Sequence, residues 1–161
     1  LGYPTYSLSV TLAALLISTA LGASLSRRGW QRPRPFLLSL LAVTVLLVGI
    51  EAIWVPAVRD AFLSSSLATR IALTAVLQLP IGLCLGMYFP TGIEILRQHQ
   101  PRLVPWAWAL NGVGSVTSSV LAVVLAMAIG FSGVAIVALG VYAIGVLSLV
   151  AVLPRPGSQG G

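Results

Sequence analysis

Residues 105–129 read PWAWALNGVGSVTSSVLAVVLAMAI and residues 133–153 read GVAIVALGVYAIGVLSLVAVL, separated only by Gly130, Phe131 and Ser132. Neither run contains a charged residue. A membrane-spanning helix needs about 20 mostly apolar residues, because each residue adds 1.5 Å across roughly 30 Å of hydrocarbon. Both runs are long enough. We therefore predict two antiparallel spanning helices joined by a tight hairpin at residues 130–133.

Three more apolar runs precede this pair, at residues 6–25, 36–55 and 70–88. Only 7% of the chain is charged and 58% is hydrophobic, whereas a soluble domain carries about a quarter charged residues. The sequence therefore predicts an all-α membrane protein whose solvent is lipid. We expect one domain, residues 1–154, built as a bundle of about five transmembrane helices, followed by a disordered cytoplasmic tail at residues 155–161.

A polar segment separates the third and fourth spans. Thr91 and Glu94 have the spacing of a capping box, which predicts that a short helix begins there. Its apolar residues would face lipid, while Arg97 and His99 would lie among the headgroups. We expect this segment to be an interfacial helix.

The formal charge of +6 comes wholly from arginine. With five spans, one side of the membrane holds seven arginines, and the other holds only Arg59 and Arg70. The positive-inside rule then places the amino terminus outside and the tail in the cytoplasm, here of a bacterial inner membrane. The arginines lie between apolar runs and form no continuous basic face, so we expect lipid contacts and no nucleic-acid partner.

Small residues recur at helical spacing in three of the runs. They are Ser18 and Gly22 in the first, Gly82 and Gly86 in the third, and Asn111, Ser115 and Ser119 in the fourth. Helices in lipid associate through close backbone approach, because apolar contact gives little drive there. These stripes predict contact faces, either inside the bundle or against another subunit.

Polar residues within the spans are the candidates for a ligand site. Glu51 either pairs with Arg59 or Arg70 at the outer interface or contacts a ligand or partner helix. Gln78 and Asn111 either form interhelical hydrogen bonds or bind a substrate.

No catalytic set is recognisable in the sequence. A single histidine, His99, and a single cysteine, Cys84, cannot build a metal site together with so few acids. We expect Cys84 to be a buried packing residue, and we expect no catalytic, cofactor or metal residues.

Several strings carry a family resemblance. They are GMYFPTG at residues 86–92, VPWAWALNG at 104–112, LGYPTYSL at 1–8 and LGAS at 21–24. Together they resemble the membrane region of integral-membrane spermidine-synthase-like proteins, also described as fused transporter/spermidine-synthase proteins, over nearly the whole chain to Leu153. The resemblance implies that membrane helices accompany a soluble aminopropyltransferase-like domain, which binds a decarboxylated S-adenosylmethionine-type cofactor. That domain is missing from this sequence, so no catalytic residue carries over.

Three functional hypotheses follow. The first is a non-catalytic membrane scaffold or accessory subunit, which packs with other membrane subunits or anchors a missing soluble domain. The second is the membrane half of a spermidine-synthase-like enzyme. The third is a small-solute transporter with Gln78, Pro80 and Asn111 along its path. Because the chain opens with Leu1, we expect it to be a piece of something longer.

Overall fold

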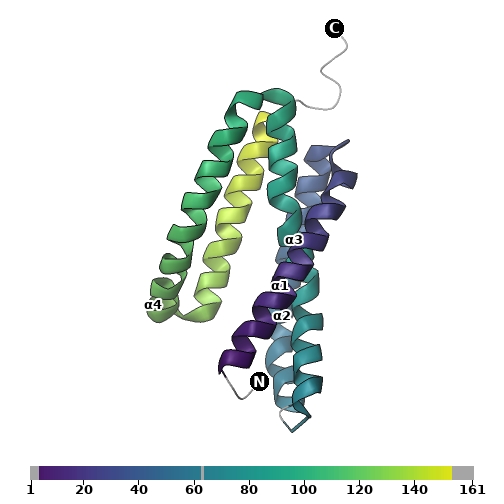
Figure 1. The fold of residues 1–161 in the computed structure, drawn as a ribbon, viewed down its shortest axis with the longest axis vertical. Helices are drawn as coiled ribbons and strands as arrows, with labels where there is room; N and C mark the ends of the chain where they lie inside the picture. The colour runs from purple at the N-terminus through teal and green to yellow at the C-terminus, as the bar shows by residue number, and fades with distance from the viewer. Residues whose placement is uncertain (1–3, 63, 154–161) are drawn as a thin grey trace.

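A computed structural model describes residues 4–62 and 64–153, and this part of the chain is helical with no strand. The all-α prediction is confirmed. The elements in chain order are α1 (Pro4–Leu25), the 3-10 turn η1 (Ser26–Gly29), α2 (Pro33–Ala61), α3 (Leu67–His99), the 3-10 turn η2 (Pro101–Leu103) and α4 (Val104–Val152). Figure 1 shows the helices running side by side along the long axis.

Four helical stretches in the described residues are long and apolar enough to cross a membrane: Leu8–Leu25, Pro33–Val55, Leu67–His99 and Pro101–Val152. Large apolar side chains such as Ile53 and Met127 are about three-quarters exposed. In water such a surface would be strongly unfavourable. The protein is therefore embedded in a membrane.

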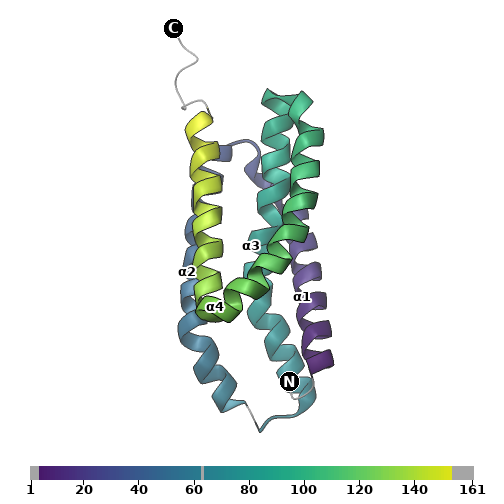
Figure 2. The same cartoon turned by 90° about the vertical axis from the view of Figure 1, so that its left-hand side faces the viewer.

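The longest helix, α4, doubles back on itself. A straight helix of its 49 residues would be about 74 Å long, more than twice the hydrocarbon thickness. Gly130 interrupts it with φ 74° and ψ 168°, a backbone conformation that only glycine adopts without strain. The ribbon reverses direction there (Figures 1 and 2). We call residues 104–129 the first arm of α4 and residues 131–152 the second arm.

The prediction of a separate interfacial helix is wrong. No separate helix begins at Thr91, because α3 continues to His99 through Pro80 and Pro90. The Thr91 hydroxyl donates to the Met87 carbonyl four residues back, 2.7 Å away, instead of capping a new helix. The helix that contains the second run, α2, extends past Pro56 to Ala61, although its apolar spanning stretch ends at Val55. Membrane helices tolerate proline where neighbouring groups take over the freed backbone carbonyl. The predicted tail at residues 155–161 lies outside the described residues.

The most extensive helix contact joins α1 and α3. Ser18 is 1% exposed and lies against Gly82, where a side chain on the glycine would collide with the serine hydroxyl. A Cβ added at Gly22 would collide with the backbone of Leu83, and one at Gly86 with the backbone of Thr19. Glycine therefore permits this separation between the two helices.

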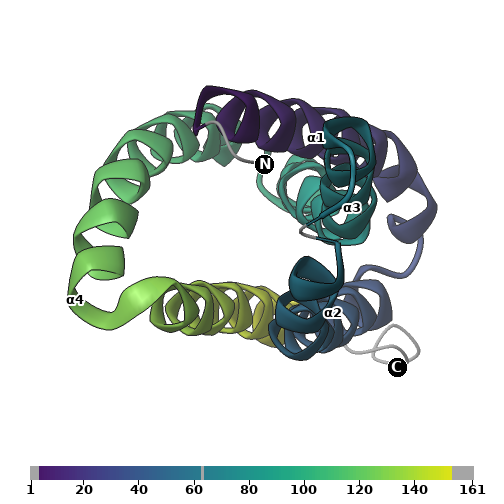
Figure 3. The ribbon, with the colours of Figure 1, turned by 90° about the horizontal axis from the view of Figure 1, so that it is seen from below.

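A second packed region lies at the end where α2 begins and where α3 and α4 end. It contains five buried apolar side chains: Leu37, Ile95, Val146, Val150 and Leu153. Seen from below, the ribbons surround a central gap, with the second arm of α4 beside α2 and the first arm on the side away from it (Figure 3). The two buried residues of α4, Val146 and Val150, both belong to the second arm.

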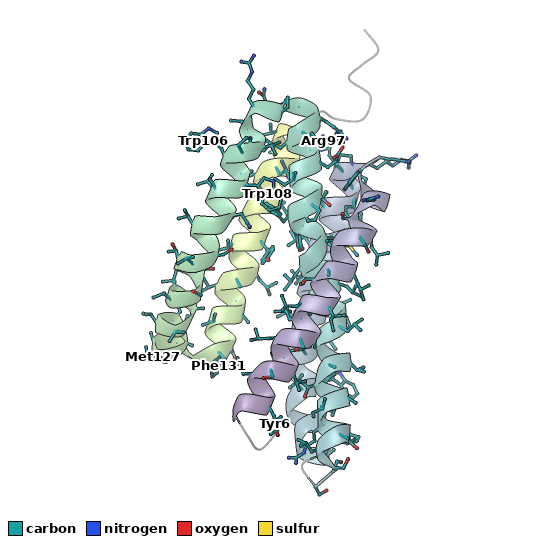
Figure 4. All side chains as sticks on the ribbon, in the orientation of Figure 1. Tyr6, Arg97, Trp106, Trp108, Met127 and Phe131 are labelled. Atoms are coloured by element: carbon teal, nitrogen blue, oxygen red, sulfur yellow. The ribbon has the colours of Figure 1, made fainter. Side chains whose placement is uncertain are left out.

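Five of the six arginines whose side chains are described lie at one end of the molecule, and only Arg70, at the start of α3, lies at the other. The η1 turn, the start of α2 and the α3–α4 connection all lie at that end, whereas the α2–α3 connection lies at the other (Figures 1 and 2). Arg97 and Trp106 share the first end, and Tyr6, Met127 and Phe131 lie toward the second (Figure 4). We call the first the arginine-rich end; its described arginine side chains are Arg27, Arg32, Arg34, Arg97 and Arg102.

Candidate functional site

A cavity of about 480 Å³ lies between α2, α3 and both arms of α4. α3 forms one wall, with Leu85, Tyr88, Phe89, Gly92 and Ile93, and Leu37 of α2 lies beside it. The first arm of α4 contributes Ala107 and Asn111, and the second arm contributes Val141, Tyr142, Gly145, Val146 and Leu149. No charged side chain lines the cavity. Its chemistry is therefore that of an apolar pocket with a few uncharged polar atoms.

The Tyr88 hydroxyl is held by a neighbouring helix. Its oxygen lies 2.9 Å from the Thr44 hydroxyl. Thr44 uses its single hydrogen to donate to the Leu40 carbonyl, 2.8 Å away, so Tyr88 must donate to Thr44. Thr44 is 1% exposed, and this bond fixes the Tyr88 ring against the cavity.

Two further polar groups face the same cavity. Tyr142 contacts Tyr88, with ring centroids 4.8 Å apart and planes tilted by 46°. Neither the Tyr142 hydroxyl nor the Asn111 side-chain amide forms a hydrogen bond within the described part of the chain. Both therefore retain their donors for a group that enters the cavity.

An aromatic contact lies at one edge of the cavity. Phe89 of α3 meets Trp108 of the first arm edge to face, with centroids 4.8 Å apart and planes at 81°. Such pairs add about 0.5–1.5 kcal/mol beyond their buried area. This contact joins the first arm to α3 near the arginine-rich end.

The predicted packing residues divide into two groups. Ser18, Gly22, Gly82 and Gly86 lie together in the contact between α1 and α3. Ser115 and Ser119 lie exposed on the first arm, where their hydroxyls donate to the carbonyls of Asn111 and Val116 at 2.7 Å. No other helix of the described chain covers this second group.

The predicted polar contacts are dispersed. Glu51 is half-buried on α2, and no ion pair joins it to Arg70 among the described side chains; the side chain of Arg59 lies outside them. On α3, Gln78 precedes Gly82 by four residues and shares its face, and its buried Oε1 atom has no partner in the part described. Of the residues predicted to line a transport path, only Asn111 reaches the cavity.

The one described ion pair lies at the arginine-rich end. Arg97 donates to both oxygens of Glu94, from Nε at 2.9 Å and from an Nη at 2.8 Å, and Gln98 donates to the same carboxylate at 2.8 Å. The nearby His99 ring lies 2.9 Å from the Ile95 carbonyl. Within residues 4–62 and 64–153, no three metal-ligating side chains gather. These contacts belong to the end of α3 and form no catalytic arrangement.

Sequence reasoning missed Thr44 and Tyr142. Thr44 lies within an apolar run and carries no motif. Tyr142 is the only hydroxyl-bearing aromatic of the last run and sits near its middle, away from the membrane boundary where tyrosine is usually found. A tyrosine at this depth was the one feature of the sequence that could have indicated a polar site within the membrane.

Comparison of the chain with family models, with curated proteins and with solved structures gave no match. The resemblance to spermidine-synthase-like membrane regions therefore rests on the sequence strings alone. The structure brings two of those strings together, since Phe89 belongs to the first and Trp108 to the second.

Proposed function

We propose that the chain is a non-catalytic membrane scaffold whose first α4 arm packs against another membrane segment. The observation that carries this proposal is the exposure of the arm: every residue from 108 to 121 is exposed. Lipid tolerates exposed apolar side chains. An arm with a stripe of small residues is, however, suited to a partner helix that approaches closely.

The small stripe is complete on one face of the arm. Ala107 and Asn111 line the cavity, and Ser115 and Ser119 follow at intervals of four on the same side of the helix, outside the cavity lining, where they are left for a partner. Because their hydroxyls already donate to their own helix, these serines need no polar partner. They present small, satisfied side chains, as the interfaces of membrane helices do.

The orientation proposed here has α4 crossing the membrane twice, which gives five crossings in total. The gathering of five of the six described arginines at one end supports a cytoplasmic arginine-rich end and an amino terminus outside. In a bacterial inner membrane, the last part of α3 then lies at the cytoplasmic interface. There Arg97 is 66% exposed by side chain while Glu94 beneath it is 9% exposed.

A soluble synthase-like domain is the second candidate partner. The contact between Phe89 of the GMYFPTG string and Trp108 of the VPWAWALNG string favours it, because two parts of the resemblance meet there. Such a domain would dock at the arginine-rich end. Sequencing upstream and downstream of this chain tests the idea directly: an adjoining reading frame with a Gly-rich nucleotide-binding fold supports it.

Crosslinking from the first arm tests the scaffold proposal. A photoreactive amino acid placed at Ser115 should yield a protein adduct of defined mass in native membranes, whereas the same group at Ile53, which is 75% exposed on α2, should label only lipid. Ser119→Leu should weaken the association about 5-fold or more, because the added bulk separates the helices. Thr117→Leu, on the opposite face of the arm, is the matched control. Lipid adducts alone from Ser115 would refute the proposal.

A further inference from the structure

We propose that the cavity between α2, α3 and the two arms of α4 binds a neutral, lipid-soluble carbonyl compound with a flat ring, of the quinone class. The cavity volume of about 480 Å³ lies within the range of small-molecule sites, about 300–1,000 Å³. This binding role goes beyond the scaffold function and does not depend on it. A ligand of this kind reaches the site through the hydrocarbon in which it dissolves.

The absence of charge in the lining selects an uncharged ligand. No Arg, Asp, Glu or His lines the cavity. A charged ligand would lose its hydration and meet no opposite charge, which is strongly unfavourable in an apolar site. Phosphates, carboxylates and polyamines are therefore excluded from this cavity.

The unused donors select a hydrogen-bond acceptor. Asn111 and Tyr142 line the cavity, one from each arm of α4. Each has a proton to donate and no acceptor within the described chain. Tyr88 is different, because its hydroxyl already donates to Thr44. A carbonyl oxygen accepts hydrogen bonds and carries no charge, so it matches the two free donors.

The aromatic walls and two glycines select a flat shape. The Tyr88 and Tyr142 rings contact each other, with centroids 4.8 Å apart, and together with Phe89 they give the cavity an aromatic lining. Gly92 and Gly145 also line the cavity, and a Cβ added at either would meet nothing within 4 Å. The cavity thus has room beside ring faces, where a planar ring packs by offset or edge contacts.

Saturable binding of a quinone tests the proposal. The full chain is reconstituted in vesicles of dioleoyl phosphatidylcholine, and binding of tritiated decylbenzoquinone is measured against protein-free vesicles. We expect a saturable component with one site per chain. Binding that only rises linearly, as simple partition into lipid does, would overturn the proposal.

Two pairs of variants locate the site. Gly145→Leu fills the cavity and should abolish saturable binding, while Gly140→Leu, on the same arm and equally free of neighbours within 4 Å, should bind as the parent does. Tyr142→Phe removes one donor and should weaken binding about 5-fold; Tyr6→Phe, outside the cavity lining, should leave it unchanged. Parent-like binding by both Gly145→Leu and Tyr142→Phe would disprove the assignment even if one of them folded poorly.

A change of lipid separates the quinone from the ester carbonyls of glycerolipids. The titration is repeated in vesicles of the ether-linked counterpart, which has no ester carbonyl. We expect the same quinone affinity in both. Affinity that rises several-fold in the ether lipid would show that lipid esters occupy the cavity, and the quinone assignment would be abandoned.

Discussion

Gly22→Leu is expected to lower the free energy of unfolding by about 3 kcal/mol, at the upper end of the usual cost of overpacking. A side chain at this position would collide with the backbone of Leu83 on α3. A backbone cannot rotate away as a flexible side chain does, so α1 and α3 must separate. The helices would then lose their most extensive contact.

Titration of the reconstituted chain with dodecyl sulfate, followed by circular dichroism, measures this loss. Gly49→Leu is the control, because a Cβ on that glycine of α2 meets nothing within 4 Å. Both substitutions favour the helix itself to a similar degree, so their difference isolates the contact. Equal unfolding midpoints for the two variants would show that α1 and α3 do not pack as described.

Leu37→Ala is expected to cost about 1–2 kcal/mol, less than the roughly 2–5 kcal/mol typical of a soluble core. Leu37 is 1% exposed and belongs to the apolar cluster at the arginine-rich end. In a membrane the unfolded reference is also apolar, so the transfer contribution nearly vanishes. The remaining loss comes from the cavity that the missing atoms leave behind.

Its neighbour Leu38 provides the comparison for this measurement. Leu38 is 43% exposed on the lipid side of α2, and Leu38→Ala should change the free energy of unfolding by less than about 0.5 kcal/mol. A cost of 4 kcal/mol or more for Leu37→Ala would indicate that this side chain is exposed to water, and not to lipid, when the protein unfolds. Equal changes in the free energy of unfolding for Leu37→Ala and Leu38→Ala would show that Leu37 does not belong to a packed cluster.

The sequence predicts the all-α fold class well because its apolar runs are long and nearly free of charge. Apolar runs of bilayer length leave no alternative to helices when the backbone must satisfy its own hydrogen bonds in lipid. A local interaction also starts α3: the Ser66 side chain accepts a hydrogen bond from the Thr69 amide at 3.2 Å and caps the helix. Such effects act between neighbouring residues and need no knowledge of the fold.

Signals that end helices in water fail inside these spans. Pro90, Thr91 and Gly92 together indicate a helix boundary in a soluble protein. Here α3 continues through them, and Thr91 is fully buried with its hydroxyl bonded within the helix. Where lipid replaces water, a backbone has nowhere else to find hydrogen bonds, so the helix persists.

The sequence does not predict which helices pack against each other. The stripes of small residues on α1 and on the first arm of α4 are alike in pattern, yet only Gly22 and Ser18 on α1 meet α3. The cavity likewise depends on how the two arms of α4 lie relative to α2 and α3. Spacing along one helix identifies a face but carries no information about which other face lies opposite.

The most direct test of the account asks whether α4 crosses the membrane twice. In a Cys84→Ser background, Ser132→Cys places one thiol beside the reversal at Gly130, and His99→Cys places one at the arginine-rich end. Sealed right-side-out vesicles are treated with a membrane-impermeant maleimide before and after detergent. Ser132→Cys should react in the intact vesicles and His99→Cys only after lysis. Protection of both thiols, or reaction of both from outside, would contradict the double crossing on which this description depends.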